Sequence, residues 1–427
     1  MVSREDQMRS LFQRLWPICR SITGNGLRES LRILGETIPM EFHEVPSGKQ
    51  VFDWEIPHEW NIEDAWLQCP DGRRICLFKE NNLHVVNYST PVDRELTWAE
   101  LEPHLHTVPH MPRAIPYITS YYKDHWGFCF SQHEKDSLPR EGTYRAFINS
   151  EKKPGSLTYG EAVLPGTSDR EILFSTYLCH PSMAINELSG PLVTAFLYKA
   201  LSQLPERKHT VRFVFAPETI GIIAYLHRIG AHLKEKLEAG YVITCVGHEG
   251  QFTYKRSRRG NTKADRAAEH VLKHSGFPVE VMDFAVGGSD ERQYCAPGWN
   301  LPVGSVMRTM YKRYPEYHTS LDNESIMSYK ALQETVDMYV RIFKTLELNR
   351  AYQTTVLHCE PRLGKRNLYP NTGAWLAGMG NPLDLVHFLA HADGETDLIE
   401  TAERRQMAAP DFEEIIRICR DNGLIAP

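Results

Sequence analysis

Several features that mark whole classes of protein are missing from this sequence. No apolar run reaches the length of a membrane span, and Met1–Asp6 are charged where a signal peptide would have an apolar core. The nine cysteines are dispersed and form no CxxC pair, which is typical of reduced thiols. We therefore expect a cytoplasmic protein with no membrane partner.

An excess of positive charge is also missing. The 48 Lys and Arg residues are outnumbered by 54 Asp and Glu residues, so the formal net charge is −6. A general nucleic-acid binder needs a basic surface to neutralise phosphates, so we expect no nucleic-acid partner. The 427 residues, 42% of them hydrophobic, are enough to build two or three domains.

Composition and periodicity divide the chain into parts. Residues 1–45 contain two segments with helical spacing of apolar residues, Gln7–Arg20 and Leu27–Leu34. Residues 46–157 are richer in Trp, Tyr and Pro and contain short β-like runs, among them Arg74–Phe78 and Leu83–Asn87. The pattern predicts a small, mostly β domain inserted between residues 1–45 and the segment that follows.

Strands and helices alternate through residues 158–350, which predicts a doubly wound α/β sheet. The expected strands are Glu171–Leu178, Thr210–Phe215, Gly240–Val246 and Leu301–Met307. The expected helices are Gly190–Leu204, Ile220–Gly230, Asp265–His274 and Tyr329–Glu347.

The last part, residues 361–427, contains three short helical patterns at Pro382–Ala392, Asp397–Arg405 and Asp411–Asn422. Acidic residues outnumber basic ones in this part, which disfavours contact with DNA phosphates. We expect this compact helical module to mediate protein interaction, including a homo-oligomer.

Polar side chains that suit a metal follow the predicted strands. His180 follows the first strand, Glu218 follows the second, and His248 and Glu249 follow the third. The carboxyl ends of strands in such a fold can meet at one edge of the sheet. Histidines and carboxylates are the usual ligands of hydrolytic zinc, so the pattern predicts a zinc site at this edge.

Longer motifs around these residues resemble a known family. They are Cys179-His180-Pro181-Ser182-Met183-Ala184, Asn186-Glu187-Leu188-Ser189-Gly190, Pro217-Glu218-Thr219-Ile220-Gly221, Lys255-Arg256-Ser257-Arg258-Arg259-Gly260-Asn261-Thr262, Ser289-Asp290-Glu291 and Pro315-Glu316-Tyr317-His318-Thr319-Ser320-Leu321-Asp322. Over nearly its whole length the chain resembles the aminopeptidase-like family DUF4910, which is similar to the M28 zinc aminopeptidases and the glutaminyl cyclases. The resemblance implies a zinc-peptidase-like α/β core, a DUF2172 β insert and a C-terminal winged helix.

The resemblance also implies roles for single residues. His180 and His318 match histidine ligands, and His248 stands near the place of an acidic ligand. Glu218 matches the general base of the M28 enzymes. Asp290 matches the acid of their Ser-Asp-His segment, so we expect it to be catalytic.

Two positions depart from the M28 pattern. Asn186 stands in the place of the aspartate that bridges two zinc ions, and Thr219 stands in the place of a ligating glutamate. Without those carboxylates, the negative charge that lets two Zn²⁺ ions lie close together is reduced. We therefore expect one zinc.

The zinc ligands are expected from a set of four residues, His180, Glu187, His248 and His318. Glu218 would then take the proton of the attacking water and pass it to the leaving amine. If Glu218 is itself a ligand, the base remains unassigned.

Substrate contacts are expected from a second set of side chains. Acidic residues, among them Asp290, Glu291 and Glu249, suit a free α-ammonium group, and Asn186 lies beside the expected metal. The basic run that contains Arg256 and Arg259 suits a carboxylate, a phosphate or a sugar acid.

We expect a zinc-dependent amide hydrolase of the aminopeptidase-like class, acting on a small aminoacylated metabolite or precursor. The substrate class rests on the resemblance, because members of the family often accompany polysaccharide or secondary-metabolite pathways. One alternative is acyl transfer or cyclisation at a single zinc, as in the glutaminyl cyclases. Another is a metal-free binding or scaffold protein on a degenerate peptidase fold.

Overall fold

The computed structural model describes residues 3–368 and 382–426 of the chain. Two compact units are present, Met1–Ala264 with Glu280–Asp337, and Asp265–Val279 with Met338–Pro427. None of the helices in the described ranges combines the length and apolar character that a bilayer span requires.

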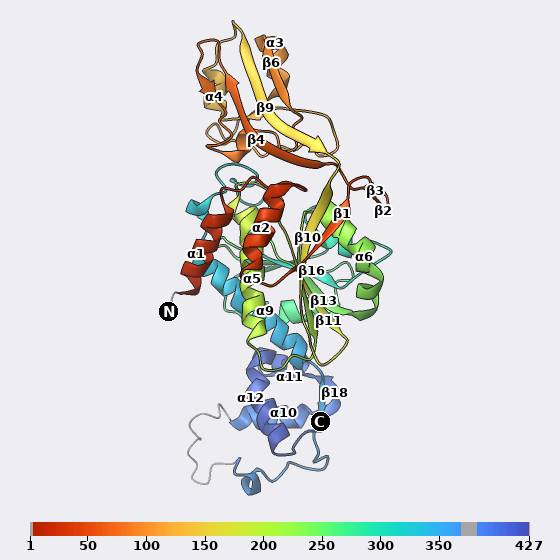
Figure 1. Ribbon diagram of the computed structural model, residues 1–427. Coiled ribbons are helices and arrows are strands. Elements are labelled where there is room, and N and C mark those ends of the chain that lie inside the picture. The colour runs from red at the N-terminus through yellow and green to blue at the C-terminus, as the bar shows by residue number, and fades with distance from the viewer. Residues whose placement is uncertain (1–2, 369–381, 427) are drawn as a thin grey trace. The chain divides into compact units, whose positions relative to one another are not determined.

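The first unit is built on an eight-stranded mixed sheet with the order β1-β10-β12-β11-β13-β16-β14-β15 (Figure 1). Its strands are β1 (Glu41–Pro46), β10 (Ser156–Leu164), β11 (Glu171–Tyr177), β12 (Thr210–Ala216), β13 (Leu237–Val242), β14 (Phe252–Lys255), β15 (Val279–Met282) and β16 (Val303–Arg308). Strands β12, β11, β13 and β16 are parallel to their neighbours in that series, whereas β1, β10 and β14 pair antiparallel. The α/β class is confirmed, and the sheet is mixed because antiparallel strands flank its parallel centre.

Helices cover both faces of this sheet. They are α1 (Arg4–Leu15), α2 (Asn25–Gly35), α5 (Ser189–Ser202), α6 (Ile220–Lys236) and the short α8 (Glu291–Tyr294). In Figure 1, α5 lies on one side of the sheet and α6 on the other. Every residue of β11 is buried, as expected for a strand at the centre of a sheet covered on both faces.

The first helix ends earlier than its periodicity predicts. We expected Gln7–Arg20, but α1 stops at Leu15, two residues before Pro17. Proline removes a backbone donor and disfavours helical geometry in the preceding residue, so the chain turns away here. As a result Arg20 leaves the helix and becomes fully buried.

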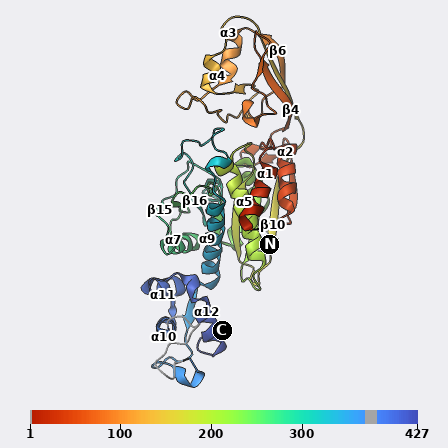
Figure 2. The same ribbon diagram turned by 90° about the vertical axis from the view of Figure 1, so that its left-hand side faces the viewer.

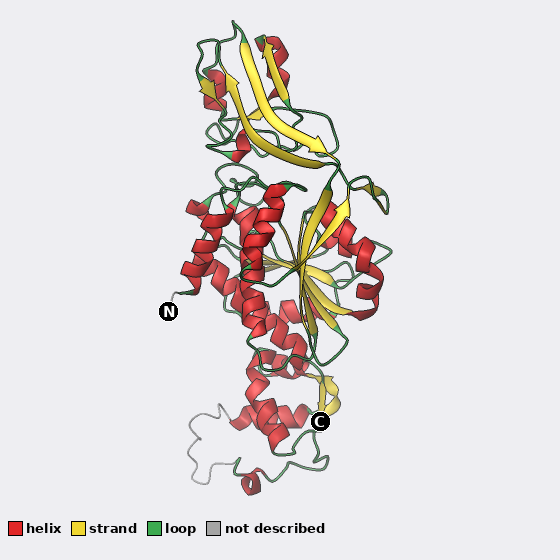
Figure 3. Ribbon diagram, viewed as in Figure 1, coloured by secondary structure: helices red, strands yellow, loops and turns green. Residues whose placement is uncertain are grey.

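The inserted segment is mostly β, as Figure 3 shows. Its elements are β2 (Gln50–Val51), β3 (Trp54–Glu55), β4 (Glu59–Gln68), β5 (Arg74–Ile75), β6 (Val92–Leu96), α3 (Trp98–Leu101), β7 (Leu105–His106), β8 (Phe128–Cys129), α4 (Gln132–Asp136) and β9 (Tyr144–Lys153). A four-stranded sheet has the order β5-β4-β9-β6. The strand expected at Leu83–Asn87 is wrong: a 3-10 turn forms at Asn82–His84, because the Asn81 side chain accepts a hydrogen bond from Leu83 N at 2.9 Å.

The second unit is mainly helical and contains one small sheet. Its elements are most of α7 (Lys263–Lys273), the second half of α9 (Tyr329–Leu348), β17 (Ala351–Gln353), α10 (Pro382–His391), β18 (Asp393–Asp397), α11 (Leu398–Arg404) and α12 (Glu413–Asp421). These elements are drawn from a second direction in Figure 2. Strands β17 and β18 pair antiparallel, and an apolar core that includes Leu398, Phe412 and Ile416 joins the helices.

Candidate active site

The site forms at the centre of the large sheet, where the strand order reverses. Strand β11 lies between β12 and β13. The chain passes from β11 through α5 to β12 on one side, and then through α6 to β13 on the other side, so the two connections run in opposite directions across the sheet. Such a switch point opens a crevice at the carboxyl ends of the strands. His180 follows β11 and Glu218 follows β12, and both side chains therefore arrive at this crevice.

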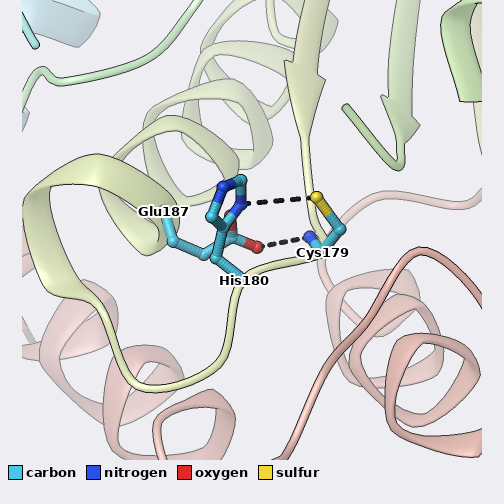
Figure 4. A group of neighbouring side chains, drawn as sticks. All are labelled: Cys179, His180 and Glu187. Carbon is cyan, nitrogen blue, oxygen red and sulfur yellow. Dashed lines mark hydrogen bonds and ion pairs between the residues drawn. The ribbon is translucent and has the colours of Figure 1, made fainter. Parts of the chain in front are cut away.

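His180 is buried, and its Nδ1 atom, on the side of the ring away from the cleft, contacts two neighbouring side chains. Its Nδ1 lies 2.8 Å from Glu187 Oε2 and 3.3 Å from Cys179 Sγ (Figure 4). Burial opposes protonation of the imidazole, but Cys179 and Glu187 outweigh it and raise the pKa of His180 well above its usual value. With Nδ1 occupied, Nε2 is the nitrogen left for the cleft, 3.7 Å from Glu218 Oε2.

Glu187 is fully buried and engaged through both of its oxygens. Oε1 accepts a hydrogen bond from Cys179 N at 2.6 Å and lies 3.6 Å from Arg20 Nε. Arg20 also donates from Nε to His180 O at 3.1 Å. The sequence predicted Glu187 as a metal ligand, and Cys179, His180 and Glu187 do offer ligand atoms within 4.8 Å of one another. Both oxygens of Glu187 already contact protein groups around His180, which also suits a residue that orients a ligand.

The segment that carries Asn186 and Glu187 is a π-helical turn, Ala184–Leu188. Asp322 holds its amino end, because Asp322 accepts hydrogen bonds from Ile185 N at 2.7 Å and Asn186 N at 2.9 Å. Burial raises the pKa of Asp322 to about 6, since these hydrogen bonds only partly offset the loss of solvent. Such turns occur frequently at functional sites, and this one turns Glu187 toward His180.

Glu218 extends into the cleft from a strained backbone. The next residue, Thr219, has φ 65°, which is an outlier for a β-branched side chain. Thr219 N donates to Asp290 Oδ1 at 2.7 Å, and Arg292 donates to Thr219 Oγ1 at 2.8 Å. These two hydrogen bonds stabilise the strained backbone conformation of Thr219. The Glu218 side chain remains 27% exposed.

The electrostatic setting of Glu218 suits a base. Burial raises its pKa, and the charges of Glu187 and Glu291 add to the rise, while His180 and Arg292 oppose it. A carboxylate with a raised pKa is a better proton acceptor near neutral pH than an ordinary exposed one.

His318 reaches the same cleft from the loop before Asp322. Its backbone is left-handed, with φ 59°, and its ring centroid lies 5.5 Å from that of His180. Tyr317 stacks on it at 3.9 Å. Burial lowers the pKa of His318 to about 3, so the imidazole is neutral at physiological pH, as a metal ligand must be.

The cleft has a volume of about 350 Å³. His180, Glu218 and His318 lie in its lining, together with aromatic side chains from the inserted segment, Trp54, Tyr117, Tyr121 and Tyr122. Arg292 and Thr219 complete the polar part of the wall. An apolar cleft with a few convergent polar groups is typical of a site for a small molecule.

Two residues of the cleft, His180 and Glu218, are close enough to share one zinc ion. Ligand atoms at about 2.1 Å from a shared zinc lie at most about 4.2 Å apart, and His180 Nε2 and Glu218 Oε2 meet that limit at 3.7 Å. His318 lines the same cleft. A second zinc lacks support, because Asn186 offers a neutral amide whose Oδ1 lies 3.3 Å from the Tyr177 hydroxyl.

Several residues predicted for the site lie outside the lining of this cleft. His248 Nδ1 is 2.9 Å from Thr309 Oγ1, and exposed Glu249 accepts from Ser328 Oγ at 2.8 Å. Asp290 and Glu291 are fully buried behind Thr219 and beside Lys255.

The two predicted substrate-binding arginines are also outside this lining. Arg256 pairs with Asp283 at 2.8 Å, and Arg259 donates to Asn300 O at 3.1 Å. Their basic run is therefore bonded to neighbouring loops.

Three residues of the site went unassigned in the sequence, Arg20, Arg292 and Asp322. Of these, Asp322 had a signal in the motif around His318, and Arg292 directly follows Asp290-Glu291.

A second group of histidines lies in the second unit. His270 and His274 face Glu403, with Nδ1 of His270 at 2.6 Å and Nε2 of His274 at 3.2 Å from Oε1. Nε2 of His270 accepts a hydrogen bond from Ala409 N at 2.8 Å. That bond places the ring proton on Nδ1, where it is donated to Glu403, so hydrogen bonding accounts for this group without a metal.

Comparison with known proteins decides the family. Residues 9–349 match the domain of unknown function DUF4910. The chain belongs to the DUF4910 family. Residues 350–427 match a winged helix-turn-helix domain, which confirms the predicted module and starts it 11 residues before position 361.

Relatives of this DUF4910 protein agree on the peptidase-like fold. A Clostridium acetobutylicum protein, named as a candidate polysaccharide biosynthesis protein with an aminopeptidase-like domain, is 45% identical over 93% of this chain and 91% of its own. The crystal structure of a candidate peptidase from the same organism is 41% identical, has a TM-score of 0.92, and covers 99% of this chain and 96% of that chain.

A more distant structure shows the fold alone. The zinc aminopeptidase BSAP from Bacillus subtilis is 10% identical, with a TM-score of 0.57 over 80% of this chain and 94% of that chain. The large sheet of the DUF4910 chain is thus that of an aminopeptidase-like protein.

Proposed function

We propose that this DUF4910 protein is an amide hydrolase that uses one zinc ion and acts on a small aminoacylated metabolite or precursor. The observation that carries the proposal is the meeting of His180 Nε2 and Glu218 Oε2 at 3.7 Å in a cleft that His318 also lines. The aminopeptidase-like fold supports the same class of chemistry.

His180 and His318 would hold the ion through imidazole nitrogens. Burial lowers the pKa of His318, which is therefore neutral already, whereas the raised pKa of His180 means that it gives up a proton when zinc binds. A zinc ion supplies Lewis acidity, which activates water and polarises the carbonyl of the substrate. Glu187 fixes the His180 ring through Nδ1, and the stacked Tyr317 fixes the His318 ring. His248 lies outside the cleft lining, so we leave it out of the proposed ligand set.

Glu218 would move the proton. Its carboxylate keeps partial exposure in the cleft, and burial raises its pKa toward the working range of a general base. It accepts a proton from the attacking water and delivers that proton to the nitrogen of the leaving amine. The aromatic wall of Tyr117, Tyr121 and Trp54 would exclude bulk water from this transfer.

The proposed substrate class rests on the volume of the cleft and on the name of a 45% identical relative. A cleft of about 350 Å³ suits a metabolite rather than a folded protein. The 45% identical relative is named for polysaccharide biosynthesis, which favours an aminoacylated sugar precursor as the substrate. Asp290 and Glu291, which the sequence suggested for a free ammonium group, lie outside the cleft lining and are bonded to Thr219 and Lys255, so we leave them out of the proposed substrate contacts.

A metal-free binding protein is the second candidate. The neutral Asn186 and Thr219 at positions where M28 enzymes place carboxylates favour it, because each removes a source of metal affinity. In that case ligands would bind the cleft and Glu218→Gln would leave their affinity largely unchanged. Product mass separates hydrolysis from the third alternative, glutaminyl-cyclase-like cyclisation or acyl transfer.

Metal analysis of the purified protein tests the main proposal. We expect about one zinc per chain by plasma mass spectrometry, lost in His180→Ala and His318→Ala. His248→Ala serves as the matched control and is expected to keep the metal. Protein that stays metal-free after zinc is added back would contradict the proposal.

The role of Glu218 needs a second measurement on the same protein. Glu218→Gln should retain zinc and lose turnover of an aminoacyl amide if Glu218 is the base. Loss of zinc together with turnover would make Glu218 a ligand and leave the base to another group. Retained turnover would contradict both assignments.

The partners of the protein are also part of the proposal. We propose a cytoplasmic protein that acts without nucleic acid and forms a homo-oligomer through its winged helix-turn-helix domain, residues 350–427. Light scattering of the full chain tests the oligomer, and a monomer at every concentration would contradict it.

A further inference from the structure

Arg292 has an unusual position for a cation. It lies on the short helix α8, half-buried, in the lining of the same cleft as His180 and Glu218. Its NH2 group donates to Thr219 Oγ1 at 2.8 Å. Within the described residues it forms no ion pair with a carboxylate, whereas Arg256 pairs with Asp283 and Arg20 with Glu187.

The guanidinium is therefore oriented but not neutralised. It has five N–H donors in a planar fork, and the bond to Thr219 uses one of them. The backbone of Thr219 is fixed by its bond to Asp290, so one edge of the fork is anchored to the side-chain hydroxyl of the residue that follows Glu218. A fork held in this way is preorganised for a planar, two-oxygen anion.

The acidic groups around Arg292 decide whether a carboxylate or a phosphate is the better ligand. Two carboxyl groups lie near the guanidinium: Glu218 lines the same cleft, and Asp290 accepts a hydrogen bond from Thr219 N at 2.7 Å. A dianionic phosphate would meet repulsion from these acids, while a single carboxylate adds one charge opposite the cation. The surroundings thus favour a carboxylate over a phosphate.

We propose that Arg292 is a specificity-determining residue that binds a carboxylate of the substrate. The site then selects amides in which a free carboxylate lies close to the amide bond that is hydrolysed with Glu218 as the base. The inference deepens the proposed function and rests on it for the identity of the reacting bond. It replaces Arg256 and Arg259, which lie outside the cleft lining, as the source of anion recognition.

The experiment compares two probes that differ in a single group. N-acetyl-L-alanine carries a carboxylate, and N-acetyl-L-alanine amide is its neutral counterpart. Dissociation constants are measured by ligand-detected NMR on the full-length Glu218→Gln protein, so that turnover plays no part. We expect the carboxylate to bind about ten times more tightly than the amide, as a charge-assisted pair provides.

Variants at two arginines assign that preference. Arg292→Gln should remove it, Arg292→Lys should keep part of it, and Arg256→Gln should leave it unchanged. The comparison is repeated after chelation, since a zinc ion also attracts carboxylates. Because the preference is a ratio between two probes on one protein, a modest loss of folding stability in a variant does not mimic it.

Three results would overturn the inference. They are equal binding of the two probes, a preference that survives Arg292→Gln, and inorganic phosphate binding more tightly than the carboxylate probe. Each concerns binding alone. Failure of the proposed hydrolysis would instead appear as absent zinc or absent turnover, with the probe preference intact.

Discussion

Glu187 Oε2 lies 2.8 Å from Nδ1 of His180, and this contact fixes which nitrogen of the histidine faces the cleft. The carboxylate is itself fully buried against Arg20, whose side chain is equally inaccessible. The two residues come from separate segments of the chain: Glu187 lies in the π-helical turn and Arg20 in the loop after α1. The chemistry of the cleft therefore depends on a buried ion pair behind it.

Replacing Glu187 by Gln should weaken both the fold and the site. Removal of one partner leaves the buried charge of Arg20 uncompensated, which costs about 3 kcal/mol of the free energy of unfolding. Loss of the carboxylate behind His180 should also lower zinc affinity about ten-fold or more. Urea unfolding and a zinc titration measure the two effects. Glu249→Gln, at an exposed position, is the control, and equal behaviour of the two variants would contradict the prediction.

Gly190 should not tolerate a side chain. A Cβ there would lie 2.4 Å from Ile243 O and 2.5 Å from Thr176 Oγ1, because α5 begins directly against the sheet. We expect Gly190→Ala to lower the free energy of unfolding by about 2 kcal/mol. Gly298→Ala is the matched control, since a Cβ at that exposed position meets nothing within 4 Å. Similar stability of both variants would show that α5 can shift without cost.

Acid should destabilise the first unit through Glu59. Arg28 forms a two-bond pair with it, at 2.8 and 2.6 Å, and lowers the pKa of Glu59 from 4.5 to about 2. Because the folded pKa is the lower one, the stabilisation is complete above pH 4.5 and is lost as pH falls toward 2. The shift corresponds to about 3 kcal/mol.

The free energy of unfolding of the parent protein and of Glu59→Gln, measured between pH 7 and pH 3, checks this contribution of Glu59. The variant should be less stable at neutral pH and should lack that part of the acid dependence. Glu55→Gln, at an exposed residue of β3, should titrate like the parent protein. A parent protein and a Glu59→Gln variant with the same slope below pH 4.5 would refute the assignment.

Thiol reactivity should single out one cysteine. Cys359 is exposed, whereas the other eight free cysteines are buried or half-buried. Burial raises the pKa of Cys179 to about 11 and that of Cys419 to about 12, so little thiolate forms there. We expect one fast-reacting thiol in the folded protein and nine after unfolding, measured with a chromogenic disulfide. Cys359→Ser should abolish the fast phase; a fast phase that persists would mean another thiol is accessible.

Most of the core elements could be predicted because their signal is local. The buried strand β11 and the helices α5 and α9 carry apolar residues at strand or helix spacing, and they lie within a few residues of the expected bounds. The long strands β4 and β9 of the insert escaped prediction. Their pairing joins Glu59 to Lys153, and one exposed face interrupts the apolar pattern.

The same distinction holds within the site. His180, Glu218 and His318 could be proposed from the sequence because each directly follows a strand or belongs to a motif. Arg20 could not, because it reaches the His180 backbone from a position 160 residues away along the chain. Arg292 looked like an ordinary neighbour of Asp290 and Glu291 until the cleft was defined.

The sequence by itself determined the family, the α/β class and the three side chains that we propose for metal and base chemistry, because these depend on residue type and local spacing. Only the tertiary structure decided the orientation of each group. It turned Glu187 toward His180 and Arg20, paired Arg256 with Asp283, and left Arg292 in the cleft without a direct ion pair to any described carboxylate. Burial and hydrogen-bond partners arise from segments distant in the chain, so they exist only once the sheet has assembled.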